Sequence, residues 1–245
     1  MDKIISSNIY NFYKNINDAC NGKYYETTNY EVVKNDLYSF PNSIFNLKSN
    51  INNFIDVISE IEENIKQGNY PPRIITEFNS VPFEFIQYFI NKNSKIEIQP
   101  GMLLKFDDIN NHQNNEIEII EISHNHLENW AEIISESFFN SKEIPTQQIE
   151  LISKLSNVKL WGAVYKEKIV GACLTQLDNE VIGLHFVGVK KEYRKLGIGK
   201  YISQESIIKH SNNTTKFAIL RASKFGENIY KEIGFKEYTK FVIIS

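Results

Sequence analysis

The sequence lacks the features that mark disulfide-rich, metal-binding and membrane proteins. Among its 245 residues there are only two cysteines, Cys20 and Cys173, and they have neither a paired spacing nor a histidine-rich neighbourhood. We therefore expect two reduced thiols and no metal site. No apolar run approaches the ~20 residues of a membrane span, and polar residues interrupt the first ten positions where a signal core would lie. We expect a cytoplasmic protein without a membrane partner.

A basic stripe is also missing. The chain has 27 Lys and Arg against 30 Asp and Glu, for a net charge of -3, and the two signs are interspersed. This distribution argues against a nucleic-acid partner. Hydrophobic residues make up 42% of the chain, which is enough for the core of one large domain or two ordinary ones.

The most polar interval, residues 107–116, has no apolar periodicity and is rich in turn-forming residues. We place a domain boundary there, with domains at residues 1–113 and 114–245. In the second domain, hydrophobic spacing predicts the following order of elements. We expect a strand at 117–122, helices at 127–138 and 149–155, strands at 160–165, 168–177 and 181–189, a helix ending near 210, a strand at 217–220, a helix ending at Ile233 before Gly234, and a strand at 238–244.

The first domain has a related pattern. We expect strands at 31–33 and 43–47, an amphipathic helix over 54–65, a strand at 73–76, a helix at 82–91, and strands at 96–99 and 102–106. The order strand, strand, helix, strand, helix, strand, strand also occurs in the second domain. The sequence therefore predicts an α/β (α+β) fold that is duplicated.

A loop with two glycines joins an apolar strand to the start of a helix at residues 187–200. Backbone N–H groups at a helix N-terminus are unpaired donors at the positive end of the helix dipole, so they favour an anion. Gly197 and Gly199 let the backbone approach such an anion closely, and Arg194 and Lys200 add positive charge. A diphosphate suits this context, although a loop with two glycines is more often a simple tight turn.

At this loop the sequence resembles the GNAT superfamily of N-acetyltransferases. Arg194, Gly197 and Gly199 match the family's Gln/Arg-x-x-Gly-x-Gly/Ala loop, which binds the pyrophosphate of coenzyme A. Residues 169–172 are similar to the family's third strand, Val187 and Val189 to its fourth, and residues 230–235 to its Tyr-x-x-x-Gly-Phe ending. The resemblance covers residues 117–245 and implies a mixed, mostly antiparallel sheet flanked by helices. The chain departs from the family at Lys191, where a Pro is common, and at Ser223, where an Asn is common.

The resemblance also implies the cofactor-binding residues. Val187, Gly188 and Val189 would hold the pantetheine arm as if it were an added strand, although the two valines can equally be read as core residues. The pyrophosphate would lie against Arg194, Lys195, Leu196, Gly197, Ile198, Gly199 and Lys200. Ser223 would donate a hydrogen bond to the cofactor or cap the next helix. Residues 48–53 of the first domain lack glycine, so we interpret residues 1–113 as a degenerate GNAT-like module and expect coenzyme A only in the GNAT domain at 114–245.

Two residues are candidates for acid–base chemistry. The resemblance places Tyr230 as the general acid that protonates the departing thiolate, against the alternative that its ring only packs on the sheet. His185 is the candidate general base, because strand alternation would give it the same face as Val187 and Val189. A structural role for His185 remains open, as do Glu180 or an ordered water as the base.

We therefore interpret the chain as an N-acetyltransferase that moves an acetyl group from acetyl-CoA to a primary amine. Cys173 has no evident His partner, so direct attack in a ternary complex is favoured over a thiol relay. A small-molecule amine is favoured as acceptor and a peptide or protein amine stays possible. The alternative is a non-catalytic acyl-CoA-binding or sensing module. The sequence does not name the acceptor or the oligomeric state.

Overall fold

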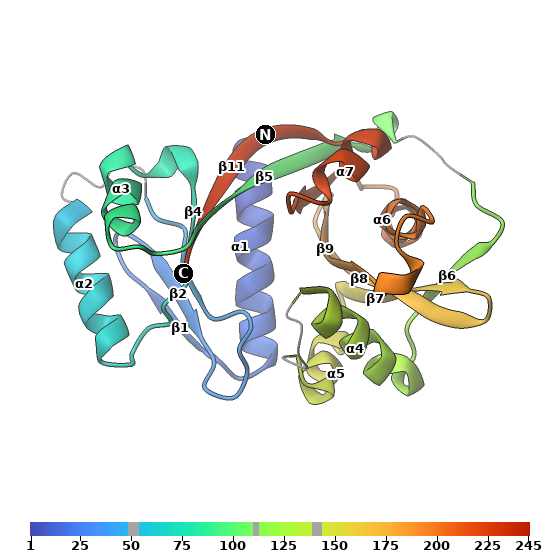
Figure 1. Ribbon diagram of the computed structural model, residues 1–245, viewed down its shortest axis with the longest axis horizontal. Coiled ribbons are helices and arrows are strands. Elements are labelled where there is room, and N and C mark those ends of the chain that lie inside the picture. Colours follow the sequence, from blue (N-terminus) through green and yellow to red (C-terminus); the bar gives the residue numbers. More distant parts are fainter. Residues whose placement is uncertain (49–53, 110–112, 139–143) are drawn as a thin grey trace. The chain divides into compact units, whose positions relative to one another are not determined.

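The computed structural model describes residues 1–48, 54–109, 113–138 and 144–245 (Figure 1). These residues form two compact units. Unit 1 consists of Met1–Gly101 with Glu237–Ser245, and unit 2 consists of Met102–Lys236. The predicted fold class is confirmed, because both units mix helices with mostly antiparallel strand pairs. The domain boundary between residues 113 and 114 stays a prediction.

Unit 1 begins with a long helix and then alternates strands and helices. Its elements are α1 (Asp2–Ala19), β1 (Lys23–Glu26), β2 (Glu31–Lys34), β3 (Ser43–Phe45), α2 (Phe54–Lys66), β4 (Ile74–Glu77), η1 (Phe78–Ser80), α3 (Phe83–Asn91), the first part of β5 (Ile96–Lys105), and nearly all of β11 (Lys236–Ile244). Strands β1, β2, β3, β4 and β11 are neighbours in that order. All these pairs are antiparallel except β3 with β4, which is parallel.

In this half two elements were missed and one prediction needs correction. Helix α1 and strand β1 were not predicted. The two strands expected at 96–99 and 102–106 are the single strand β5, because Pro100 and Gly101 continue it instead of turning it. Gly101 suits this packed position, since a Cβ there would lie 2.6 Å from Cγ2 of Thr239.

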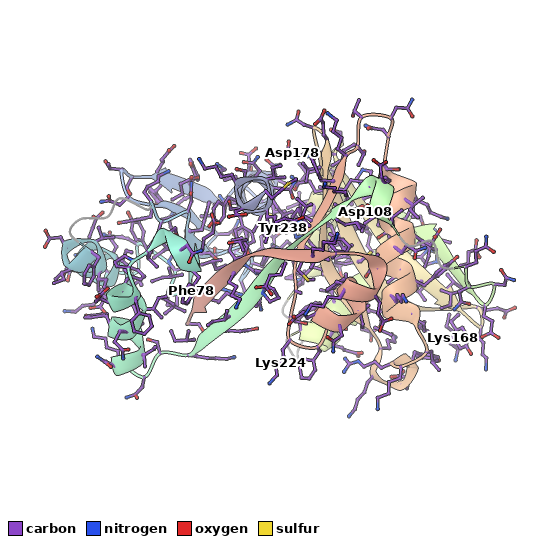
Figure 2. All side chains as sticks on the ribbon, turned by 90° about the horizontal axis from the view of Figure 1, so that it is seen from above. Phe78, Asp108, Lys168, Asp178, Lys224 and Tyr238 are labelled. Atoms are coloured by element: carbon purple, nitrogen blue, oxygen red, sulfur yellow. The ribbon has the colours of Figure 1, made fainter. Side chains whose placement is uncertain are left out.

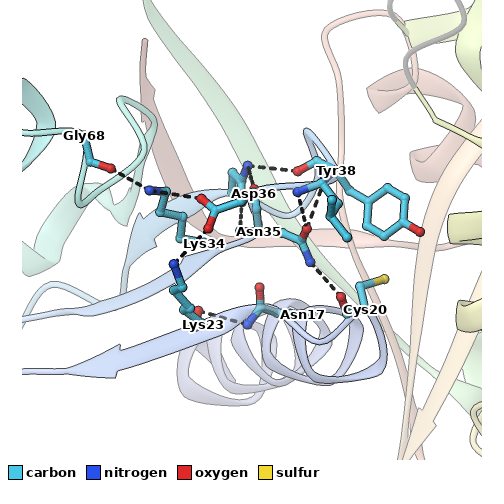
Figure 3. Close-up of polar contacts among 10 residues, drawn as sticks. Asn17, Cys20, Lys23, Lys34, Asn35, Asp36, Tyr38 and Gly68 are labelled. Carbon is cyan, nitrogen blue, oxygen red and sulfur yellow. Dashed lines mark hydrogen bonds and ion pairs between the residues drawn. The ribbon is translucent and has the colours of Figure 1, made fainter.

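Helices cover both faces of the unit 1 sheet. On one face α1 buries Ile5, Ile9 and Ile16, and its Tyr10 ring lies 5.3 Å from the ring of Phe45 in β3. On the other face, apolar side chains of α2 and α3 pack with those of β2, β3 and β4. The turn after β2 is held by polar contacts (Figure 3): Asn35 Nδ2 donates to the carbonyl of Cys20 at the end of α1.

Unit 2 contains a meander of strands followed by alternating helices and strands. Its elements are the last part of β5, η2 (Phe106–Asp108), β6 (Ile117–Glu121), η3 (His124–His126), α4 (Leu127–Phe138), α5 (Thr146–Ser153), β7 (Val158–Tyr165), β8 (Lys168–Asp178), β9 (Val181–Val189), η4 (Lys191–Tyr193), α6 (Ile198–His210), β10 (Phe217–Arg221) and α7 (Glu227–Ile233). Figure 2 labels both ends of β8, Lys168 and Asp178. The predicted elements of this half are confirmed, with bounds shifted by a few residues.

The strands of unit 2 follow the order β10, β9, β8, β7, β6. Neighbours are antiparallel except β9 with β10, which run parallel. Helix α4 lies on one face of β8 and β9 and α6 on the other (Figure 1). A Cβ on Gly188 would meet Ser137 of α4, whereas a Cβ on Gly171 would meet Ile198 of α6.

The two halves share an order of elements and of pairing senses. An antiparallel meander, a helix, a parallel strand and a second helix occur as β1, β2, β3, α2, β4 and α3. The same series occurs as β7, β8, β9, α6, β10 and α7. This agreement supports the predicted duplication.

Candidate active site

Strand β9 contains a bulge just before the glycine loop. His185 pairs with Leu174 and Gly188 pairs with Ala172, so two residues of β9, Phe186 and Val187, face one residue of β8. Phe186 takes the left-handed φ of 54°, which is rare for a bulky side chain. A bulge of this kind reverses the alternation of side chains and redirects the strand beyond it.

The bulge overturns one prediction, that His185 shares a face with Val187 and Val189. The two valines pack against the core cluster on the α6 side. His185 pairs with Leu174, which lies two residues from Ala172 on the α4 side. The extra residue in β9 therefore puts His185 and the two valines on opposite faces.

Burial also changes the chemistry of His185. Desolvation lowers the pKa of His185 to about 3, and the positive charge of Arg221 acts in the same direction. The imidazole is therefore neutral at physiological pH but a weak proton acceptor. Glu180, the other candidate base among the side chains, pairs with Lys216 at 2.6 Å in the turn before β9. It lies seven residues before Val187, about 20 Å along an extended strand.

Strands β9 and β10 pair over only a short length. Their parallel register joins Val181, Ile182 and Gly183 to the first residues of β10. From Leu184 onward β9 keeps its register with β8, while the described register with β10 has ended. The edge of β9 at Val187, Gly188 and Val189 therefore has main-chain groups that an extended ligand can pair with, except the Val189 carbonyl, which accepts from Arg194 Nε.

The loop after β9 ends in an uncapped helix N-terminus. Gly197 is the N-cap of α6, has a left-handed φ of 78°, and supplies no side-chain cap. A Cβ on Gly197 would meet nothing within 4 Å, and one on Gly199 would meet only Val189 at 3.7 Å. The space over both glycines is therefore open, as a bound diphosphate requires.

Main-chain donors of this loop precede the hydrogen-bond ladder of α6. The first i to i+4 bond of the helix runs from the Tyr201 N–H to the Gly197 carbonyl, so the N–H groups of Ile198, Gly199 and Lys200 precede the helical ladder. Together with the helix dipole they favour an anion.

The two basic residues of the loop are partly engaged in other contacts. Arg194 Nε donates to the Val189 carbonyl at 3.1 Å and so ties the loop to the end of β9. Lys200 pairs with Glu232 of α7 at 3.0 Å. Lys195 takes a left-handed φ of 66°, and Leu196 between it and Gly197 is exposed. The main chain is therefore the better anchored part of this anion site.

Tyr230 lies in α7 and is 9% exposed. Burial raises the pKa of its phenol, Cys173 raises it further, and a hydrogen bond with Ser203 opposes them. The phenol is therefore protonated at neutral pH and can donate. Gly226 makes room for the ring, because a Cβ there would lie 2.8 Å from Tyr230 Cε2.

Ser203 links Tyr230 to the glycine loop. It is completely buried, and its hydroxyl donates to the Gly199 carbonyl at 2.7 Å. Ser203, Gly226 and Phe186 were not predicted as site residues from the sequence. The signal available for the first two was helical spacing, since Ser203 is four residues after Gly199 and Gly226 four residues before Tyr230.

Cys173 is fully buried, and desolvation raises the pKa of its thiol to about 12. It is therefore a thiol at neutral pH. Ser223 is not the N-cap of α7, as one interpretation expected, because Gly226 takes that position and no side chain caps the helix. The Ser223 carbonyl accepts the N–H groups of Gly226 and Glu227 in the turn before α7.

In the described ranges, no group of three or more His, Cys, Asp and Glu side chains is arranged to hold a metal ion. Nor does any helix there have the length and apolarity to cross a membrane. The segment 48–53, for which we predicted no coenzyme A binding, lies outside the described residues except for Lys48.

Comparison with solved structures shows the same fold in other proteins. A functionally unknown conserved protein from Staphylococcus epidermidis matches with a TM-score of 0.71 and 14% identity over 92% of this chain and 94% of its own. A GCN5-related N-acetyltransferase from Kribbella flavida matches at 0.66 and 12%, covering 91% and 88% of the two chains. A tandem GNAT protein from the clavulanic acid biosynthesis pathway matches at 0.58 and 11%, covering 88% and 77%.

No curated protein matches the sequence. The family model for an acetyltransferase (GNAT) domain matches residues 118–241, which hold the bulged strand, the glycine loop and Tyr230. The chain therefore belongs to the GNAT family of acetyltransferases.

Proposed function

We propose that unit 2 binds acetyl-CoA and transfers its acetyl group to a primary amine by direct attack in a ternary complex. The observation that carries this proposal is the open, uncapped N-terminus of α6 next to the edge that β9 exposes beyond its pairing with β10. The helix N-terminus suits the diphosphate of acetyl-CoA, and the strand edge suits the amide groups of its pantetheine arm.

Tyr230 is the general acid in this proposal. When the amine attacks the thioester carbonyl, the C–S bond breaks and coenzyme A leaves as a thiolate that needs a proton. The buried, protonated phenol of Tyr230 lies on the α6 side, as do Val187 and the loop. Burial strengthens a hydrogen bond to the developing thiolate, because no bulk water competes for it.

An ordered water is the favoured proton acceptor for the attacking amine. The lowered pKa makes His185 a weak base, and Glu180 lies at the far end of β9. A water near the bulge can take the proton and pass it to solvent. We propose no covalent enzyme intermediate, because the only cysteine of unit 2 is buried as a neutral thiol.

The acceptor is proposed to be a small amine, with a peptide or protein amine as the competing class. The experiment that tests the function measures thiol release from acetyl-CoA with aminoglycosides, polyamines and amino acids as acceptors. Saturable release that depends on one amine supports the proposal. Tight coenzyme A binding without release on any amine would favour the rival function, an acyl-CoA-binding or sensing module.

A further inference from the structure

Unit 1 repeats the bulge that shapes the candidate site of unit 2. Phe45 of β3 pairs with Glu31, and the Lys48 N–H donates to the Asn29 carbonyl at 2.8 Å. Asn46 and Leu47, the two residues that follow β3, therefore face the single residue Tyr30, which lies between Asn29 and Glu31. This two-to-one count is the one found at Phe186 and Val187.

The two bulges also agree in backbone conformation and in the face of the sheet on which their side chains pack. Asn46 has φ 52° and Phe186 has φ 54°. Leu47 packs into the core cluster formed with α2 and α3, as Val187 packs on the α6 side. The opposite face of the bulge is covered by α1, because Lys14 of this helix pairs with the buried carboxylate of Glu31 at 3.1 Å. Helix α1 thus occupies in unit 1 the position that α4 has in unit 2.

A groove of about 850 Å³ opens on this α1 face. Its walls come from α1, from the bulge residues Asn46 to Lys48, and from the residues that follow β4. The volume is within the range of small-molecule sites. The groove therefore lies beside the bulge, at the ends of the parallel strands β3 and β4.

The charges of the lining select the ligand class. Five lining residues are charged: Asp2, Lys3, Lys14, Lys48 and Glu77. The ion pair with Glu31 neutralises Lys14, which leaves two cations and two anions. In the described part of the chain none of these four makes an ion pair. A ligand with one charge of each sign complements this balance, whereas a phosphate or a polyamine meets two like charges.

We propose that this groove is a binding site for a free amino acid or a short peptide, held by its ammonium and carboxylate groups. Asp2 and Glu77 receive the ammonium, and Lys3 and Lys48 receive the carboxylate. Asn79, which also lines the groove, supplies a side-chain amide for polar substituents of the ligand. This site is separate from the proposed acetyl transfer in unit 2 and does not depend on it.

The first test measures binding to the full chain by calorimetry and thermal shift. The probes are the twenty L-amino acids and glycylglycine, with inorganic phosphate and spermidine as comparators. We expect at least one zwitterion to bind, and its amide and its N-acetyl derivative to bind about tenfold or more weakly, because each lacks one charge. The proposal is overturned if no zwitterion binds, or if phosphate, spermidine or the singly charged derivatives bind as tightly as the zwitterion.

The second test locates the site. Ser7 is exposed on α1 and lines the groove, so Ser7→Trp fills the groove while Ser7→Ala is the matched control. Loss of binding in the Trp variant alone, with about a tenfold loss in Glu77→Gln, supports the site. Retained binding in Ser7→Trp overturns it.

Circular dichroism and coenzyme A affinity, measured on the same variants, check that the chain has folded. A folded chain that binds the amino acid but not coenzyme A refutes the proposed function alone. A folded chain that binds coenzyme A but no zwitterion refutes the groove alone.

Discussion

The sharpest test of the phosphate loop is a pair of substitutions at two glycines that have a similar left-handed φ and equally open space at the position of a Cβ. Gly197 has φ +78° and Gly68 has φ +74°, and a Cβ on either would meet nothing within 4 Å. A side chain at each position therefore fits in space, and each left-handed residue costs about 1–2 kcal/mol of folding free energy. Both Gly197→Glu and Gly68→Glu should therefore lower Tm, with the larger loss in Gly68→Glu, because a carboxylate interacts favourably with the N-terminus of α6 and unfavourably with the C-terminal end of α2.

Only one of the two should affect coenzyme A. Gly68 follows α2 in unit 1, whereas Gly197 caps the helix that we propose holds the diphosphate. Two like charges about 4 Å apart repel by roughly 4 kcal/mol at an effective dielectric constant of 20. A flexible Glu side chain relieves part of that repulsion. We therefore expect Gly197→Glu to raise the Kd for coenzyme A at least about 100-fold, and Gly68→Glu to leave it unchanged.

Calorimetric titration with coenzyme A measures this difference, and two more variants separate its causes. Gly197→Ala adds strain without bulk, and Gly197→Gln adds bulk without charge. The order of Kd values should be Gly, Ala, Gln, Glu, with the largest step between Gln and Glu. If the Gln and Glu variants bound coenzyme A equally, or if Gly68→Glu weakened binding as much as Gly197→Glu, the loop would not be an electrostatic phosphate site.

Three further outcomes are expected. Tyr230→Phe should lower kcat by about 10²- to 10⁴-fold with little change in acetyl-CoA affinity. The control variant Tyr193→Phe, in η4, should keep its kcat. If Tyr230→Phe kept full kcat on an acceptor for which chemistry limits the rate, the general-acid role would be contradicted. Gly226→Ala should lower both Tm and kcat, because the new Cβ must displace the Tyr230 ring from 2.8 Å; an unchanged kcat would show that the ring position is not critical. In His185→Gln, Tm should decrease less steeply with falling pH below pH 6.5 than in the unsubstituted protein. Any ionisation seen near neutral pH in the kcat/KM profile should remain in this variant. Loss of that ionisation would show that His185 is the base.

The sign of the last effect follows from the pKa values. Burial lowers the pKa of His185 to about 3 and that of His210 to about 4, against about 6.5 in an unfolded chain. Both side chains are neutral in the folded protein and become protonated on unfolding below pH 6.5. Their contribution to stability is complete above about pH 6.5 and is lost as the pH falls towards 3 to 4. The His210 contribution remains in the His185 variant, so the slope should fall without vanishing.

Much of the fold could be predicted because its pattern is local. Strand β9 matches its predicted bounds, and Gly234 ends α7 with a left-handed φ of 119°, as a C-terminal glycine should. Helix α1 was predictable too, since Ile5, Ile9 and Ile16 lie on one helical face. It was missed because Asn, Ser and Lys residues between them hide that periodicity.

The candidate site was harder to predict where it depends on tertiary contacts. The glycine loop and Tyr230 are readable as motifs, whereas the bulge is not, because Phe is a poor predictor of a left-handed residue. Phe186 is held there by edge-on ring contacts with Trp130 at 6.3 Å and Phe138 at 6.2 Å, both from α4. Strict alternation therefore failed at His185, one residue before a conformation that depends on a distant helix.

The bulge occurs in both units, whereas the glycine loop follows it only in unit 2. In both halves the αL residue turns a strand away from its parallel neighbour, and a helix covers the opposite face. In unit 2 the next segment adds an open glycine at a helix N-terminus, which suits a diphosphate. In unit 1 the position of Gly188 is taken by Lys48, which places a cation at the groove. If both proposed sites bind their ligands, a shared backbone feature with different side chains serves a coenzyme in one unit and a zwitterion in the other.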